Sequence, residues 1–96
     1  MQERRQPEII AGRVNADGSI AAGDGFSVQK TGTGTYVITM APGFRLLSVV
    51  TSATIVNQAA AGAVQNDRVF NINVFLCSTG ALSDQPSCFT AVGVQT

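Results

Sequence analysis

The stretch "RVFNINVFLC", residues 68–77, alternates apolar and polar side chains with a period of two. One face of an extended chain carries four apolar side chains, which are Phe70, Ile72, Val74 and Leu76. The opposite face carries Val69, Asn71, Asn73 and Phe75. Strict alternation over this length predicts a β-strand with one buried face. Such a strand needs a second layer over its apolar side, so this stretch predicts a fold of packed sheets.

The rest of the chain shows the same pattern of short apolar segments and tight turns. Further strands are predicted over residues 9–14, 20–22, 26–30, 35–40, 45–56 and 88–95. No segment keeps the 3.6-residue period of an amphipathic helix. About six or seven short strands at spacings near ten residues predict an all-β chain, folded as a small antiparallel β-sandwich of jelly-roll-like type. Residues 1–8 are polar and predict a tail or linker, and residues 9–96 predict a single β-sandwich domain.

Charge and hydropathy exclude several classes of partner. Six basic and six acidic residues leave no net charge and no basic patch, so we expect no nucleic acid partner. No apolar run approaches 18 residues, so we expect no membrane insertion. The first residues lack the apolar segment of a signal peptide. An extracellular location would therefore be reached through cell lysis.

The sequence offers no arrangement of residues for catalysis. It contains no histidine, which excludes Ser–His and Cys–His pairs. Two cysteines with neither a histidine nor a nearby carboxylate do not make a zinc site. Asp17 and Asp24 each stand beside a glycine in a turn, where an aspartate serves the backbone. We therefore expect no enzyme activity, no cofactor and no metal site.

Cys77 and Cys88 flank the polar loop 78–87 and are the only reactive side chains to consider. If the strands at 68–77 and 88–95 pair as a terminal hairpin, the two cysteines face each other within reach of a disulfide. The other interpretation is a pair of free, half-buried thiols that act as small apolar side chains. The sequence leaves both interpretations open.

Counting chain reversals assigns the turns to the two ends of the predicted sandwich. Turns 15–19, 31–34 and 57–67 share the end away from the N-terminus, whereas loop 78–87 lies at the N-terminal end, where it would brace a stalk. Segment 57–67 is the longest of the first group, and its uncharged amides suit hydrogen bonds to sugars or peptide backbone. It could equally be a plain connector or a contact between subunits. The candidate tip residues are Asn57, Gln58, Gln65, Asn66 and Asp67.

The composition also predicts self-association. Hydrophobic residues make up 45% of the chain and charged residues only 12%, about half the usual charged share of roughly 25%. A domain of this size is marginally stable by itself. Val69 and Phe75 lie on the second face of the 68–77 strand, where a neighbouring chain could cover them. We expect a homotrimer; the alternative is that these two are isolated exposed apolar residues, which are common.

Four pieces of the chain, taken in order, resemble the small β-rich C-terminal modules of bacteriophage tail fibres and of phage-like or collagen-like bacterial proteins. These pieces are "GRVNADGSIAAGDGFSVQKTGTGTYVITM", "FRLLSVVTSATI", "FNINVFLCSTGALSDQP" and "CFTAVGVQ". The first contains a T-G-x-Y-x-I-T strand motif, carried by Thr33, Gly34, Tyr36, Ile38 and Thr39. The third contains an S-x-G-x-x-x-D motif, carried by Ser78, Gly80 and Asp84.

The resemblance covers about residues 12–94 and implies a trimeric knob on a phage virion, released by lysis. Such a tail-fibre or spike tip is non-catalytic and serves host receptor binding or fibre capping. Its partners would be its own copies and a host surface carbohydrate or protein. The chain departs from the pattern in its paired cysteines, in segment 57–67 and in the lack of a coiled coil or collagen repeat before residue 9. The alternative function is a stand-alone bacterial β-sandwich that binds carbohydrate or a protein partner.

Overall fold

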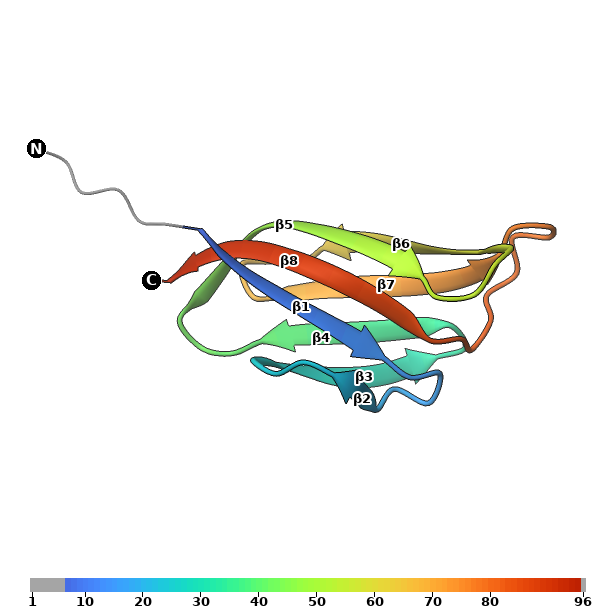
Figure 1. The fold of residues 1–96 in the computed structure, drawn as a ribbon, viewed down its shortest axis with the longest axis horizontal. Helices are drawn as coiled ribbons and strands as arrows, with labels where there is room; N and C mark the ends of the chain where they lie inside the picture. Colours follow the sequence, from blue (N-terminus) through green and yellow to red (C-terminus); the bar gives the residue numbers. More distant parts are fainter. Residues whose placement is uncertain (1–6, 96) are drawn as a thin grey trace, which may run out of the picture.

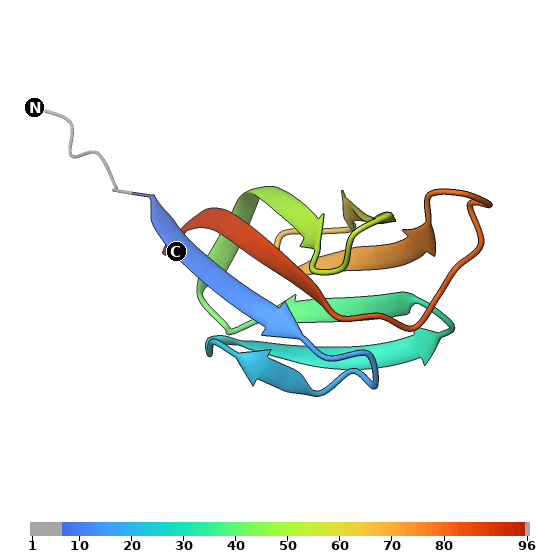
Figure 2. The ribbon, with the colours of Figure 1, turned by 45° about the vertical axis from the view of Figure 1, so that its right-hand side comes forward.

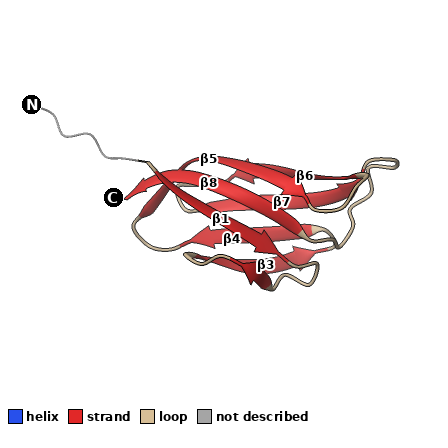
Figure 3. Ribbon diagram, viewed as in Figure 1, coloured by secondary structure: helices blue, strands red, loops and turns tan. Residues whose placement is uncertain are grey.

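The computed structural model describes residues 7–95, which form eight β-strands and no helix (Figure 1, Figure 3). The strands are β1 (Glu8–Val14), β2 (Ile20–Ala22), β3 (Phe26–Gly32), β4 (Thr35–Met40), β5 (Phe44–Ala53), β6 (Gln58–Val64), β7 (Val69–Leu76) and β8 (Ser87–Gln95). The prediction of an all-β antiparallel sandwich is confirmed, with eight strands in place of six or seven. Most of the predicted tail at 1–8 lies outside the described residues, and β1 already begins at Glu8.

The strands form two four-stranded antiparallel sheets that lie face to face (Figure 2). One sheet has the order β2-β1-β8-β5 and the other the order β3-β4-β7-β6. The last strand, β8, lies between β1 and β5 and pairs with both along its length. The chain therefore crosses from one sheet to the other immediately after β7, and this crossing places the loop between β7 and β8 at an end of the sandwich.

The core lies between the two sheets and follows the predicted alternation. In β4 the side chains of Tyr36, Ile38 and Met40 are buried. In β7 those of Phe70, Ile72 and Val74 are buried as well. Phe89 of β8 closes the core from the other sheet and packs edge to face on Phe26 and Phe70, with ring centroids 4.9 and 5.0 Å apart. Aromatic pairs in this geometry contribute about 0.5–1.5 kcal/mol beyond the area they bury.

Segment 58–64, "QAAAGAV", was predicted as part of a loop and is instead the edge strand β6. It pairs with β7 over its whole length, from Gln58 opposite Leu76 to Val64 opposite Phe70. Alanine and glycine have low intrinsic strand preference, so the sequence carries no strand signal here. They suit this position because β5 approaches closely: a Cβ on Gly62 would lie 2.8 Å from Thr51 Cγ2. The Thr51 hydroxyl also donates to the Ala60 carbonyl at 2.9 Å and ties the two sheet edges together.

The outer face of β7 is covered more fully than the alternation predicts. Val69 and Phe75 are half-buried. The loop after β7 turns back so that Leu82 forms a β-bridge with Phe75. The chain itself thus covers part of the two side chains that were assigned to a contact with a neighbouring subunit.

Candidate functional site

The two ends of the sandwich carry different loops. Residues 15–19, 33–34, 54–57 and 77–86 connect strands at one end, which we call the loop end. Turns 23–25, 41–43 and 65–68 lie at the opposite end, where β1 begins, which we call the N-terminal end. Figures 1 and 2 show loop 77–86 as the segment that extends farthest from the start of β1.

The extra strand separates the five candidate tip residues, so the prediction that they form one tip loop is wrong. Asn57 and Gln58 lie at the loop end, whereas Gln65, Asn66 and Asp67 lie at the N-terminal end, one strand length away. Gln58 is also turned inward, and its Oε1 is buried without a hydrogen-bond partner among the described residues. Only Asn57 remains at the surface of the loop end, with a left-handed φ of 70°.

The cysteines do not face each other, and the predicted terminal hairpin is wrong. β7 and β8 belong to different sheets, and Cys77 and Cys88 are both free thiols. Ser87 and Phe89 point into the core, so Cys88 lies on the outer face of its sheet, with Sγ 3.6 Å from the Ser52 carbonyl oxygen. Loop 77–86 lies at the loop end and not at the N-terminal end, so it cannot brace a stalk.

The two motifs behind the family resemblance meet at the loop end. The Gly34 N–H donates to Asp84 Oδ1 at 2.7 Å, and Lys30 Nζ lies 3.2 Å from the same oxygen. Gly34 has a φ of +63°, and a Cβ there would lie 2.6 Å from the Val74 carbonyl oxygen and 2.7 Å from the Ser83 nitrogen. Only glycine fits this position, because both the backbone conformation and the available space exclude a side chain.

Loop 77–86 is held by backbone hydrogen bonds along the end of β7. The Ser83 N–H donates to the Val74 carbonyl at 2.9 Å, and the Leu76 N–H donates to the Ala81 carbonyl at 2.9 Å. The pairing of β4 with β7 begins at Thr35, which lies opposite Asn73. Beyond this point residues 81–83 take the place of β4 beside β7. These hydrogen bonds restrict the conformation of loop 77–86.

Three titratable groups at the loop end have shifted pKa values. The hydrogen bond from Gly34 is the main cause that holds the pKa of Asp84 below its ordinary value. Hydrogen bonds from Ser19 lower the pKa of Asp17 in the same way. Burial raises the pKa of Tyr36, and the negative charges of Asp84 and Asp17 raise it further. The Tyr36 hydroxyl donates to the Ala16 carbonyl at 2.7 Å and so joins turn 15–19 to the core.

Three apolar side chains are exposed at the loop end. Val56 is 84% exposed, and Ile55 and Leu82 are exposed as well. Their loops are adjacent, because the Cys77 N–H donates to the Asn57 carbonyl at 3.0 Å. Sequence analysis missed these residues, although an Ile-Val pair directly before a turn residue is itself an unusual signal, since turns are mostly polar.

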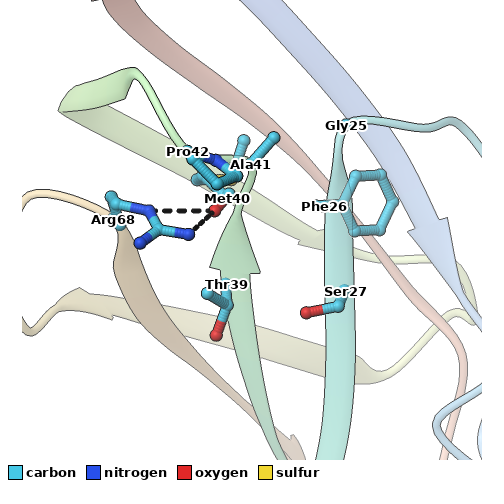
Figure 4. Close-up of a pocket in the computed structure, with 8 residues that line it drawn as sticks. All are labelled: Gly25, Phe26, Ser27, Thr39, Met40, Ala41, Pro42 and Arg68. Carbon is cyan, nitrogen blue, oxygen red and sulfur yellow. Dashed lines mark hydrogen bonds between the residues drawn. The ribbon is translucent and has the colours of Figure 1, made fainter.

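A pocket of about 320 Å³ opens at the N-terminal end (Figure 4). Its lining residues are Gly25, Phe26, Ser27, Thr39, Met40, Ala41, Pro42 and Arg68. Arg68 follows the predicted residues Asn66 and Asp67, and the Arg68 N–H donates to Asn66 Oδ1 at 2.9 Å. The guanidinium donates twice to the Met40 carbonyl, from Nε at 3.2 Å and from Nη2 at 3.0 Å. Sequence analysis missed Arg68, whose only signal was its place after a polar turn.

Within residues 7–95, no three histidine, cysteine or acidic side chains come together in a way that could hold a metal ion. The same part of the chain contains no helix long and apolar enough to cross a membrane. Comparison of the chain with family models, with curated proteins and with solved structures finds no match.

Proposed function

We propose that the chain is a non-catalytic adhesion module of the phage tail-fibre type, in which the loop end contacts the host receptor. The observation that carries this proposal is the separation of the two ends. The first strand, β1, begins at one end, and the constrained loops 33–34 and 77–86 meet at the other. A fibre attached through the N-terminus would present the loop end outward, on a virion released by lysis.

The rigidity of the loop end supports a binding role. Binding residues concentrate on loops held by a rigid scaffold. A loop that is already ordered loses less conformational entropy when it binds, which favours affinity. The bonds from Gly34 to Asp84 and from Ser83 to Val74 supply this order before any partner arrives.

The exposed aliphatic side chains favour a protein receptor over a carbohydrate. Ile55, Val56 and Leu82 offer neither an aromatic face nor a hydrogen-bonding group to a sugar. Apolar side chains at the centre of a contact, surrounded by polar atoms, are typical of protein interfaces. The absence of histidine from the sequence, and the engagement of the Asp17 and Asp84 carboxylates by neighbouring donors, support a non-catalytic role.

Self-association belongs to the same proposal, and the outer face of the β2-β1-β8-β5 sheet supports it. Four side chains that share this surface define what we call the aliphatic face: Ile9, Val50, Val92 and Val94. Ile9 lies opposite Val92 in the pairing of β1 with β8, and it is 70% exposed. A homotrimer that packs through this face would cover apolar surface that the isolated chain leaves in water.

A cell-binding assay tests the receptor role. The protein would carry a fluorescent label at its N-terminus and be measured by flow cytometry on a panel of bacterial strains. We expect binding to a subset of strains, and we expect the Val56→Ser/Leu82→Ser variant to lose it with an unchanged melting temperature. The matched control is Gln65→Ala/Asn66→Ala at the N-terminal end, which should bind as the wild type does. Loss of binding in the control alone, or no binding to any strain, contradicts the proposal.

A further inference from the structure

We propose that the pocket beside Arg68 binds a small hydroxylated carboxylate of about the size of one acidic sugar unit. This site lies at the N-terminal end, so the inference does not depend on the receptor role of the loop end. Its volume of about 320 Å³ is at the lower limit of small-ligand sites, which span roughly 300–1,000 Å³.

The Arg68 guanidinium is held in place over the pocket. The Met40 N–H donates to the Arg68 carbonyl at 2.7 Å, and Nε and Nη2 of Arg68 donate back to the Met40 carbonyl. Arg68 is thus tied to β4 through both its backbone and its side chain. A guanidinium fixed in advance loses less side-chain entropy when it binds a ligand.

The hydrogen bonds to Met40 leave part of the guanidinium available. Arginine has five N–H donors, of which two are used here, so both Nη1 donors and one Nη2 donor remain. The Nη1–Nη2 edge can therefore bind the two oxygens of one carboxylate. Arg68 forms no ion pair with any residue from 7 to 95. The neighbouring Asp67 carboxylate lies 3.8 Å from Arg45 Nε, so its partner is Arg45 and not Arg68.

Two hydroxyl groups line the same pocket as the guanidinium. Ser27 and Thr39 are opposite each other in the pairing of β3 with β4, and both line the pocket. Figure 4 shows the Ser27 hydroxyl turned toward Thr39. Neither hydroxyl makes a side-chain hydrogen bond to another described residue. Each can donate and accept, which suits a ligand hydroxyl next to the carboxylate.

The remaining wall is apolar and comes from Ala41 and Pro42. A sugar ring combines a C–H face with hydroxyl edges, so it matches a pocket with one apolar wall and one polar wall. A bare anion would use Arg68 alone and leave the hydroxyls and the apolar wall without contacts. The combination of groups therefore favours a hydroxylated carboxylate over a simple carboxylate or a neutral sugar.

The test is a titration of the isotope-labelled protein with glucuronate, glucose and acetate, followed by NMR. We expect saturable shifts with glucuronate at the Arg68 Nε–H and at the amides of Ser27 and Thr39. Glucose should cause none, and acetate should bind at least about tenfold more weakly. No saturable shift with tens of millimolar glucuronate, or acetate binding as tightly as glucuronate, would overturn the inference.

Variants locate the binding site. Arg68→Gln should weaken glucuronate binding at least about tenfold, because it removes a charge-assisted pair. Arg45→Gln is the matched control at the same end and should leave the affinity unchanged. Ser27→Ala/Thr39→Ala removes hydroxyls that make no side-chain hydrogen bond to another described residue and should weaken binding about fivefold. Equal losses in the two arginine variants, or full affinity in the hydroxyl variant, would assign the binding to general surface charge and overturn the inference.

Discussion

At the scale of single residues, Gly34 and Asp84 join parts of the chain that lie 50 positions apart. Gly34 supplies an N–H and leaves room for the Val74 carbonyl and the Ser83 nitrogen. Asp84 accepts that N–H and adds the contact to Lys30. The sequence motifs therefore have a specific structural reason: a side chain on Gly34 would push loop 77–86 away from β7.

Substitution of Gly34 by alanine measures this close approach. We expect Gly34→Ala to lower the free energy of unfolding by about 3 kcal/mol, because the left-handed backbone and the crowded Cβ add together. Gly80→Ala is the matched control, since Gly80 has a φ of +73° and nothing within 4 Å of a Cβ. It should cost only about 1 kcal/mol. Urea denaturation measures both, and equal losses would mean that loop 77–86 does not contact Gly34.

Asp84 makes the stability of the loop end depend on pH. Its pKa in the folded protein lies below the ordinary 3.8, so the charged carboxylate is favoured by folding. The stabilisation is therefore complete above pH 3.8 and disappears as the pH falls through the lower folded pKa. We expect the melting temperatures of the wild type and Asp84→Asn to differ most near neutral pH and to converge as the pH falls through the folded pKa of Asp84. A difference that stays constant into acid would show that the Asp84 charge has no role.

At the scale of elements, β6 determines where every later segment lies. It adds one chain reversal between β5 and β7, so turn 65–68 lies at the N-terminal end and loop 77–86 at the loop end. It also pairs with the edge of β7 that does not pair with β4. A strand of small residues at a sheet edge thus determines which loops lie at the same end of the sandwich.

Hydrogen exchange distinguishes a strand from a loop at residues 58–64. The Asn57 carbonyl accepts from the Cys77 N–H, and the Gln65 N–H donates to the Val69 carbonyl. The backbone N–H and C=O groups of the odd-numbered residues of β6 therefore point toward β7. We expect the amides of Ala59, Ala61 and Ala63 to exchange slowly and those of Ala60 and Gly62 to exchange faster. NMR-detected exchange gives the individual rates. Uniformly fast exchange across the segment would restore the loop interpretation.

The placement of β7 and β8 in different sheets makes a prediction about the thiols. Protein handled without reductant should add two alkyl groups, one at Cys77 and one at Cys88. Cys77 is exposed, whereas Cys88 is half-buried and close to the Ser52 carbonyl, so Cys77 should react faster. Intact mass against time follows the reaction. Protein that takes up no alkylating agent until it is reduced would contain the disulfide after all.

At the scale of the whole molecule, the two sheets present different outer surfaces. The β3-β4-β7-β6 sheet carries hydroxyl and amide side chains, among them Gln29, Thr39 and Asn71. The other sheet carries the aliphatic face, on which Val50 is 68% exposed. Large exposed apolar patches are uncommon on monomers and often mark contacts between proteins.

The aliphatic face predicts the effect of a single charge on self-association. Light scattering should give a mass of three chains of 9.9 kDa for the wild type, and Val50→Asp should reduce it to one. A carboxylate buried at an interface without a partner is strongly unfavourable. The matched control is Val56→Asp, an exposed valine at the loop end, which should leave the mass unchanged. A wild-type protein that is monomeric at micromolar concentration would contradict the trimer.

The sequence by itself determined the strands whose side chains alternate, because a period of two is a local property of an extended chain. Residues 35–40 and 69–76 show this, and their inward side chains form the core as predicted. The motif residues Gly34 and Asp84 were also found in the sequence, though not their contact. Strand pairing was decided only by the tertiary structure, since hydrogen-bond partners come from distant parts of the chain. Residues 58–64 have no strand preference of their own and become β6 because β7 offers them a ladder of hydrogen bonds. That one strand separated the predicted tip residues and moved loop 77–86 to the opposite end. The placement of β7 and β8 in different sheets kept Cys77 apart from Cys88.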